Sequence, residues 1–359
     1  MWVVYLFTDC KSIYDEAVSN VRENLQYLDV SIFNHILSGR IEMGKKKKKV
    51  IIDCDPGHDD VMAILSILAS DDVEVLGITT VCGNNYCNVV TENLLNVLSY
   101  INRTDICVAK GQDRPLIYNP EPQDAHGYNG LEGFDFPQPI MQIVSNNAVE
   151  FMKNLIDEED NKVTILALAP LTNIALLLRT YPEVKKNIDE IILMGGSIYR
   201  GNILARSEFN IYADPHAAEM VMESGVKTVI LPLEGCDYCL VTEEDIAYWE
   251  NEDGRASRIV AALMNYFAEY GRKRGRKEFT VFDLGVSMYL LHPEMFEGYN
   301  CSCKVVLEGA DTRGMTIIEP KEKSHIKVLT KCDTELFRKY IREDIDKIDK
   351  QFALNYPNE

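Results

Sequence analysis

The sequence lacks any apolar run of the length that a membrane-spanning helix needs, which is about 20 residues. Its first apolar stretch, residues 2–7, has no basic lead-in and reaches Asp9 too early to be the core of a signal peptide. We therefore expect a cytoplasmic protein that does not bind a membrane.

Positive charge is also scarce, since 37 Lys and Arg residues stand against 56 Asp and Glu residues and give a formal net charge of −19. Such a surface repels nucleic-acid phosphates and anionic lipids, so we predict a small neutral or cation-assisted substrate and no nucleic-acid partner. The exception is the lysine run at residues 45–49. It is either a nuclear or phosphate-binding signal or, more simply, the solvated approach to a buried strand.

The ten cysteines do not form the dense, even framework of a small secreted domain, so we interpret them as reduced thiols. A four-thiolate zinc site that combines Cys236 and Cys239 with Cys301 and Cys303 is the alternative. The second pair is one residue too tight for the usual structural spacing.

The chain is long enough for one large core or two modest ones, and one α/β domain at residues 45–359 is the simpler prediction. Residues 1–44 are set apart as an N-terminal extension that is helical or dispensable. Met43 precedes the lysine run, so an alternative is that the functional chain begins there.

From residue 50 onward, short β-branched runs alternate with helical patterns. This alternation predicts a mostly parallel central sheet with helices on both faces. The expected strands are residues 50–54, 73–81, 163–168, 188–194 and 226–231. The expected helices are residues 59–69, 89–101, 147–156, 171–178, 215–222, about 243–270 and 333–349, with two or three further strands between 304 and 330.

Four carboxylates gather around the end of the first predicted strand. Asp53 and Asp55 are two residues apart and project to the same side. Residues 56–57 turn the chain, and Asp59 and Asp60 start the next helix, where the helix dipole favours anions. The cluster therefore lies at the carboxyl edge of the sheet, where open α/β sheets bind their ligands.

So many neighbouring anions repel one another unless a cation neutralises them, and carboxylate oxygens select a hard ion such as Ca²⁺ or Mg²⁺. The sequence therefore implies a metal. The alternative is structural: Asp59 and Asp60 merely cap a helix, and Asp53 binds a loop.

Residues 50–60 resemble the amino-terminal signature of the inosine-uridine-preferring nucleoside hydrolase family. Further matches follow in family order over roughly residues 49–345, at 79–84, 126–127, 171–175, 193–196, 208–210, 214–215 and Asp283. The resemblance implies a nucleoside hydrolase-like fold, hydrolysis of the N-glycosidic bond of free ribonucleosides in purine salvage, and a homodimer or homotetramer.

The resemblance also implies a Ca²⁺ site formed by Asp55, Asp60, Asp283 and the main-chain carbonyl of Leu168. Asp55 would then accept the proton of the metal-bound water that attacks the anomeric carbon. The transition state is oxocarbenium-like, so carboxylates around the sugar stabilise the charge that develops.

The remaining family positions are predicted to bind the substrate. Asp59 and Asn210 are assigned to the ribose 2′-hydroxyl, Asn84 to the neighbourhood of the water, and Asn202 and Glu208 to the 5′-hydroxyl. The other residues of this group are Met194, Phe209, His126 and Phe282. Asn84 and Asn202 follow glycines and are otherwise turn residues, and Met194 is otherwise a core residue.

One position departs from the family pattern. Base-nonspecific members have a histidine before the last aspartate that protonates the leaving base, and here that position is Phe282, which cannot donate a proton. His126 lies in the segment that reaches the base in relatives, and residues 266, 267 and 270 are aromatic. Purines are protonated at the imidazole ring more readily than uracil, so we expect purine nucleosides to be preferred.

Two other functions stay open at this point. One is a nucleoside-binding protein with impaired catalysis, suggested by Phe282. The other is a haloacid-dehalogenase-like phosphatase, whose Asp-x-Asp loop also ends a first strand. That family has Thr or Val two residues after the second aspartate, where this chain has Gly57.

Overall fold

One sheet of nine strands organises the described part of the chain, in the order β10-β9-β11-β6-β5-β4-β1-β2-β3. The computed structural model describes residues 46–273 and 275–355. The predicted extension at residues 1–44, with Met43, lies outside the described residues and stays a prediction.

Seven neighbouring strands of the sheet are parallel: β1 (Lys48–Cys54), β2 (Val73–Thr80), β3 (Val108–Lys110), β4 (Val163–Ala167), β5 (Ile188–Met194), β6 (Thr228–Leu231) and β11 (Ile326–Cys332). Two antiparallel strands, β9 (Phe296–Val305) and β10 (Thr316–Pro320), extend the sheet beyond β11. A separate two-stranded sheet pairs β7 (Leu240–Thr242) with β8 (Glu278–Thr280).

Buried residues alternate between two cores because successive strand side chains point to opposite faces. In β1, Ile51 packs in one core and Ile52 in the other. The first core contains helices α5 (Ala148–Glu158), α6 (Thr172–Thr180) and α8 (Pro215–Met222). The second contains α3 (His58–Ala69), α4 (Cys87–Tyr100), α11 (Arg255–Arg272), α12 (Leu284–Leu291) and α13 (Thr334–Asn355).

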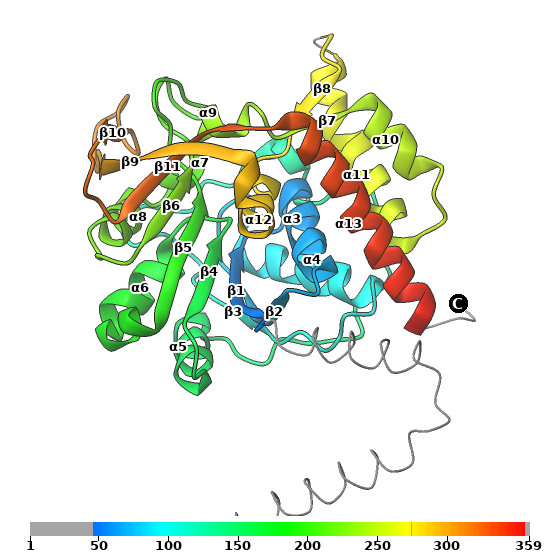
Figure 1. Ribbon diagram of the computed structural model, residues 1–359, viewed down its shortest axis with the longest axis horizontal. Helices are drawn as coiled ribbons and strands as arrows, with labels where there is room; N and C mark the ends of the chain where they lie inside the picture. Colours follow the sequence, from blue (N-terminus) through cyan, green and yellow to red (C-terminus); the bar gives the residue numbers. More distant parts are fainter. Residues whose placement is uncertain (1–45, 274, 356–359) are drawn as a thin grey trace, which may run out of the picture. The chain divides into compact units, whose positions relative to one another are not determined.

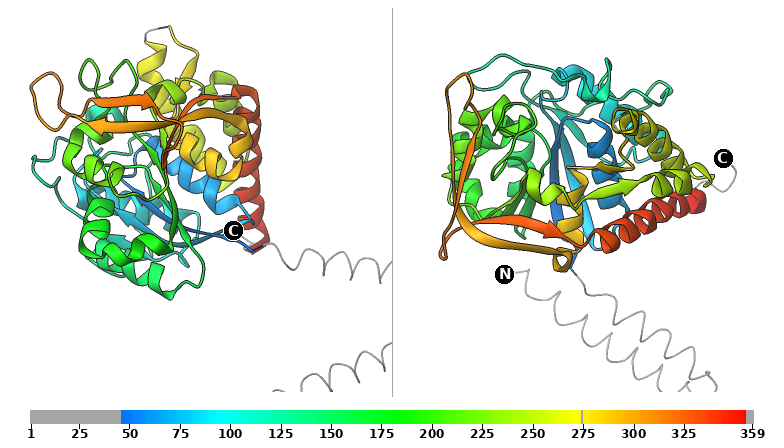
Figure 2. Two further views of the ribbon diagram at one scale, coloured as in Figure 1. Left: turned by 60° about the vertical axis from the view of Figure 1, so that its left-hand side comes forward. Right: turned by 90° about the horizontal axis from the view of Figure 1, so that it is seen from above.

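The two sets of helices lie on opposite sides of the sheet in Figure 1, and the view from above in Figure 2 shows the same three layers. The predicted fold class, a mostly parallel central sheet covered on both faces, is therefore confirmed. No helix of the described residues has the length and apolar character to cross a bilayer.

The long helix predicted at about residues 243–270 is wrong. Two helices occupy this region, α10 (Glu243–Glu250) and α11, and residues 251–254 separate them. Asn251 ends the first helix. Gly254 has an extended conformation and precedes the second helix, and glycine has a low helix propensity. Three strands of only three residues each, β3, β7 and β8, were not predicted.

Strand register brings the loops of the site to one edge of the sheet. Asp53 in β1 is level with Thr79 in β2 and with Ala167 in β4. Met194 at the end of β5 is level with Leu231 at the end of β6. The loops that follow these parallel strands therefore leave from the same edge, where α/β sheets bind ligands.

Candidate active site

The loop after β1 is fixed by the side chain of Asp60. Its carboxylate accepts hydrogen bonds from the backbone N–H groups of Asp55 at 3.2 Å and Gly57 at 3.0 Å. A side chain at Gly57 would lie 2.8 Å from the ring of His126, so only glycine fits there. The turn and the start of α3 are thus held together before any ligand binds.

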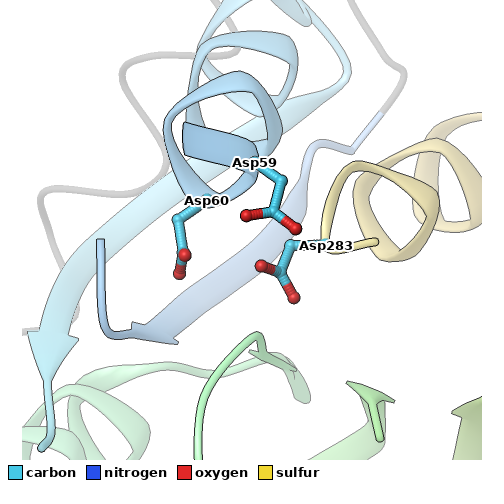
Figure 3. Close-up of side chains that lie close together, drawn as sticks. All are labelled: Asp59, Asp60 and Asp283. Carbon is cyan, nitrogen blue, oxygen red and sulfur yellow. The ribbon is translucent and has the colours of Figure 1, made fainter. Parts of the chain in front are cut away.

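Three carboxylates converge at this edge: Asp59, Asp60 and Asp283, each offering an oxygen within 4.8 Å of the others. Figure 3 shows the three side chains lying side by side at the start of α3 and α12. Asp59 and Asp60 lie in the first turn of α3, and Asp283 is the N-cap of α12. Two helix N-termini, which favour negative charge, therefore face the same point.

Asp55 lies beside this group and is almost completely buried, with 1% of its surface exposed. Its Oδ2 accepts the backbone N–H of Asn84 at 2.6 Å. The Asn84 side-chain amide donates to the Asp55 carbonyl at 3.1 Å and to Asp60 Oδ2 at 3.4 Å. Asn84 thereby links Asp55 to the cluster.

The residues of this cluster fit a hard divalent cation. One carboxylate oxygen each of Asp55, Asp59 and Asp283 is buried and has no hydrogen-bond partner among the described residues. Buried polar atoms without a partner are rare, and an ion together with the hydroxyl groups of a bound ligand would supply the partners that these oxygens lack. The carbonyl of Leu168 already accepts the Asn210 side-chain amide at 3.0 Å, and a carbonyl oxygen has a second lone pair for an ion.

Burial and mutual repulsion raise the pKa values of these acids. Burial is the main cause that raises the pKa of Asp55 well above its usual range, and the negative charge of Asp60 is the second. Burial likewise raises the pKa of Asp283, with the charge of Asp59 as the second cause. Burial raises the pKa of Asp60 to about 7. A bound cation would oppose these shifts because it favours the ionised form of each carboxylate.

Asp53 does not join the cluster, contrary to the sequence prediction. Its Oδ1 accepts hydrogen bonds from Thr79 Oγ1 at 2.6 Å and from the Asn173 side-chain amide at 2.8 Å. Asn173 also donates to the carbonyl of Thr80 at 2.9 Å. Asp53 therefore ties β1 to β2 and α6, and burial raises its pKa to about 7.

The alternative zinc site is not formed by the described residues. Cys236 and Cys239 belong to the core on one face of the sheet, whereas Cys301 and Cys303 belong to the core on the other. The nine described cysteines are free thiols.

A cavity of about 410 Å³ opens above the carboxylates. It is lined by all the predicted site residues except Asp55 and Asp60, namely Asp59, Asn84, His126, Leu168, Met194, Asn202, Glu208, Phe209, Asn210, Phe282 and Asp283. An adjoining chamber of about 720 Å³ shares six lining residues with it: Gln123, Ala125, Asn202, Phe267, Arg276 and Phe282. The structure thus brings together residues that are far apart in the sequence.

Glu208 and Asn210 organise the part of the cavity in which the sugar was predicted to bind. Glu208 caps the short helix α7 (Phe209–Ala213) and accepts backbone N–H groups from Gly196, Asn210 and Ile211 at 2.8–3.1 Å. Burial raises the pKa of Glu208 to about 7. The Asn210 amide donates to the carbonyls of Leu168 and Met194, which fixes its orientation.

Aromatic side chains gather on the side of the cavity where His126 lies, and Gln123 and Arg276 are polar members of the same wall. Phe282 donates its backbone N–H to Asp59 Oδ2 at 3.2 Å and lines the cavity with its ring. Nε2 of His126 is 4.0 Å from Asp59 Oδ1. Phe267 stacks on His126 with ring centroids 5.8 Å apart, and Tyr266 lines the adjoining chamber. The side chain of residue 270 lies outside the described residues.

His126 is backed by a second histidine. Its Nδ1 is 2.7 Å from Nδ1 of His58, and Nε2 of His58 is 2.7 Å from the carbonyl of Glu132. Burial lowers the pKa of His126 to about 4 and that of His58 to about 3. Both rings are therefore neutral near pH 7, and His58 turns toward His126 instead of the acidic cluster.

Sequence reasoning missed several residues of the cavity wall: Gln123, Ala125, Arg200, Ile203 and Arg276. Ala125 lies in the 3-10 helix Asp124–His126 and the others lie on loops, and their local sequences form no recognisable motif. It also missed Glu234, a buried carboxylate behind the wall that is 5% exposed. Its position in the sequence could have revealed it, because Glu234 is an acidic residue within an otherwise apolar stretch that follows β6.

The fold and the site define an α/β enzyme with a buried acidic cluster, suited to a metal ion, at the carboxyl edge of its sheet. Residues 50–339 match the model of the family "Inosine-uridine preferring nucleoside hydrolase". The chain belongs to this family, as the resemblance in its motifs predicted, and it is a ribonucleoside hydrolase, an N-glycosyl hydrolase. The phosphatase alternative is wrong.

Two curated relatives are pyrimidine-specific ribonucleoside hydrolases RihA. The protein from Photobacterium profundum is 37% identical over 275 residues, which cover 76% of this chain and 89% of the relative. The protein from Escherichia coli O1:K1 is 38% identical over 273 residues, which cover 75% and 88%.

Solved structures share the fold. The plant nucleoside hydrolase PpNRh1 is 27% identical with a TM-score of 0.78, and the match covers 83% of this chain and 98% of that one. A purine-preferring ribonucleoside hydrolase from Gardnerella vaginalis is 25% identical with a TM-score of 0.79, covering 85% and 100%.

Proposed function

We propose that the chain hydrolyses free pyrimidine ribonucleosides to ribose and base with a Ca²⁺ ion held by Asp55, Asp60, Asp283 and the carbonyl of Leu168. The observation that carries this proposal is the set of buried, unpartnered carboxylate oxygens below a cavity of nucleoside size. The ion, when bound, supplies charge neutralisation, orientation of the ribose diol and acidification of a water molecule.

Asp55 acts as the general base in this proposal. The backbone N–H of Asn84 fixes the carboxylate through Oδ2, so Oδ1, which has no partner among the described residues, is left for both the ion and the proton of the attacking water. General-base catalysis requires such a fixed acceptor at hydrogen-bond distance from the water. The neighbouring carboxylates then stabilise the positive charge that develops on the sugar as the glycosidic bond breaks.

The sugar is bound by groups that already line the cavity. We assign Asp59 and Asn210 to the 2′-hydroxyl, Asn202 and Glu208 to the 5′-hydroxyl, and Met194 to the apolar surface of the ribose. Phe209 and Phe282 complete the wall. These assignments predict that the substrate is a ribonucleoside and not its deoxy counterpart.

The base preference rests on two opposing arguments. The proton donor missing at Phe282 favours purines, because their imidazole nitrogen is protonated more easily than uracil. The relatives named pyrimidine-specific are 37–38% identical, whereas the purine-preferring neighbour is 25% identical. The pyrimidine-specific relatives do not support the purine preference expected from Phe282. We give the specificity of these relatives more weight than the missing proton donor. His126, which lines the cavity beside Phe282, is then the first residue to test as the proton donor.

A panel of nucleosides tests this proposal. Uridine, cytidine, inosine and guanosine are assayed for base release by the full chain with Ca²⁺. A higher kcat/KM for uridine and cytidine supports pyrimidine specificity. A higher kcat/KM for inosine and guanosine supports the argument from Phe282 instead, and no release from any nucleoside would contradict the proposed function.

The remaining expectations are parts of the same proposal. We propose a homodimer or homotetramer in the cytoplasm, in which residues 1–44 are dispensable for the domain at 45–359. Deletion of residues 1–42 should leave the melting temperature and turnover nearly unchanged. A large fall in melting temperature would show that the segment packs on the domain.

A further inference from the structure

Glu234 is a buried carboxylate for which the proposed reaction has no use. It lies in the short helix α9 (Leu233–Cys236) after β6 and is 5% exposed. Its two oxygens accept backbone N–H groups from three consecutive residues: Ile198 at 2.8 Å, Tyr199 at 3.0 Å and Arg200 at 3.2 Å. It does not line the cavity.

The three N–H groups belong to the loop between β5 and α7, residues 195–208. This loop carries Asn202, which lines both the site cavity and the adjoining chamber. The Arg200 guanidinium adds a second attachment, because it donates to the carbonyl of Leu233 at 2.8 Å and to Asp237 at 2.5 Å. The loop is therefore fastened to α9 immediately before Asn202.

The loop contains no helix or strand. The Ser197 N–H donates to Thr316 Oγ1 at 2.9 Å and Ser207 pairs with Met315 in an isolated bridge, so these contacts hold the loop on either side of the amides that Glu234 accepts. Its tip closes on itself, where Asn202 donates its backbone N–H to the carbonyl of Ser207 at 3.1 Å. Its beginning is held by Glu208, which accepts the N–H of Gly196 at 2.9 Å. Between these points Glu234 satisfies three consecutive amides, and hydrogen bonds to a carboxylate are stronger than those to neutral acceptors.

We propose that Glu234 is a positioning residue that holds this loop so that Asn202 meets the ribose 5′-hydroxyl. Glu234 thereby determines how strongly the enzyme distinguishes a ribonucleoside from its 5′-deoxy counterpart. The inference rests on the proposed function, in which Asn202 binds that hydroxyl. In a glutamine at position 234, an NH₂ donor replaces one of the two accepting oxygens and faces a backbone N–H donor. The two donors repel each other, so the loop shifts and Asn202 moves away from the 5′-hydroxyl.

The test compares kcat/KM for uridine and 5′-deoxyuridine in the full chain with Ca²⁺. In Glu234→Gln we expect kcat/KM for uridine to fall about tenfold or more, because small displacements of binding groups lower rates strongly. The value for 5′-deoxyuridine should change less than about threefold, since no hydroxyl is present to be held. If wild type favours inosine, inosine and 5′-deoxyinosine replace this pair.

Glu219→Gln is the matched control. Glu219 also accepts a backbone N–H, that of Val305 at 2.7 Å, but it does not line the cavity. This variant should leave the ratio of kcat/KM for uridine to kcat/KM for 5′-deoxyuridine unchanged. In the double variant with Asn202→Ala, Glu234→Gln should add little to the loss of that ratio, because coupled residues are not additive.

An equal loss on both substrates, or a fully additive double variant, would overturn the positioning role while leaving the proposed function intact. Wild type without base release would overturn the proposed function and this inference with it. If Glu234→Gln does not fold, Glu234→Asp is measured, since it keeps the charge but withdraws the carboxylate by one methylene. An unchanged ratio in that variant would also overturn the inference.

Discussion

The backbone N–H of Asn84 donates to Oδ2 of Asp55 at 2.6 Å, and the other oxygen of this carboxylate, Oδ1, is buried without a hydrogen-bond partner. Asn84 follows β2 and Asp55 follows β1, so two neighbouring parallel strands determine how the carboxylate is turned. A general base needs this kind of fixed orientation, because proton transfer requires a defined distance to the water.

Asp55→Asn should lower base release by at least ~10²-fold, the range typical of a lost general base. The amide neither accepts the proton of the water nor neutralises a cation. Base release is measured with Ca²⁺ in excess, and Asp113→Asn, which changes an exposed carboxylate paired with Lys110, is the control. Full activity of Asp55→Asn would exclude Asp55 as the base.

The 2′-deoxynucleosides should be poor substrates. Asp59 Oδ1 is buried without a partner and Asn210 is fixed by two carbonyls, so both are ready to bind the 2′-hydroxyl. A site built to bind a hydroxyl leaves its polar groups unpaired when the hydroxyl is absent, which lowers kcat/KM by about 10⁴-fold in strong cases. Equal kcat/KM for uridine and 2′-deoxyuridine would contradict these assignments.

Ca²⁺ should stabilise the protein more at pH 7.5 than at pH 5. The folded-state pKa of Asp60 is about 7, and those of Asp55 and Asp283 are also raised. A carboxyl group with a raised pKa favours folding below its unfolded pKa of about 3.9, and that contribution is lost as the pH rises through the folded value. Repulsion in the metal-free protein is therefore greatest above pH 7.

Thermal unfolding with and without saturating Ca²⁺ measures this effect. We expect an increase in Tm on the order of 5 °C at pH 7.5 and a smaller one at pH 5. Mg²⁺ at the same concentration is the comparison. A Ca²⁺ effect that is equal at both pH values would show that the ion binds away from the buried carboxylates.

Phe282→His should raise the rate on uridine far more than on 4-nitrophenyl riboside. The substitution introduces a proton donor at the cavity wall, which is typically worth ~10² to 10⁴ in rate. The nitrophenolate leaves without protonation, so it serves as the internal control. If the ratio of the rate on uridine to the rate on 4-nitrophenyl riboside does not change, another residue supplies the proton. His126→Ala is then the next variant to measure.

The sequence was sufficient to predict the sheet and most of the site because both depend on local patterns. The continuous apolar run at residues 191–194 supported a strand at 188–194, which has the observed bounds. Asp59 and Asp60 follow a strand and open a helix, and the resemblance to the family added Asp283 from a distant part of the chain. The structure places these three carboxylates together.

The rest depends on contacts between residues far apart in the sequence. Asp53 looked like a member of the cluster, but Thr79 and Asn173 bind it instead, and no local pattern reveals those partners. Glu234 lies 34–36 residues from the amides that it accepts. Asn251 and Gly254 break a helix that continuous periodicity had suggested.

The central claim is that the buried carboxylate cluster holds a divalent cation that hydrolysis of the glycosidic bond requires. The most direct measurement is base release from uridine, or from inosine if wild type prefers purines. It is assayed before dialysis against a chelator, after dialysis, and after Ca²⁺ is returned. The account predicts that activity is lost on dialysis and restored by Ca²⁺ in wild type, and that Asp283→Asn is not restored. Undiminished base release from fully metal-free protein would contradict it.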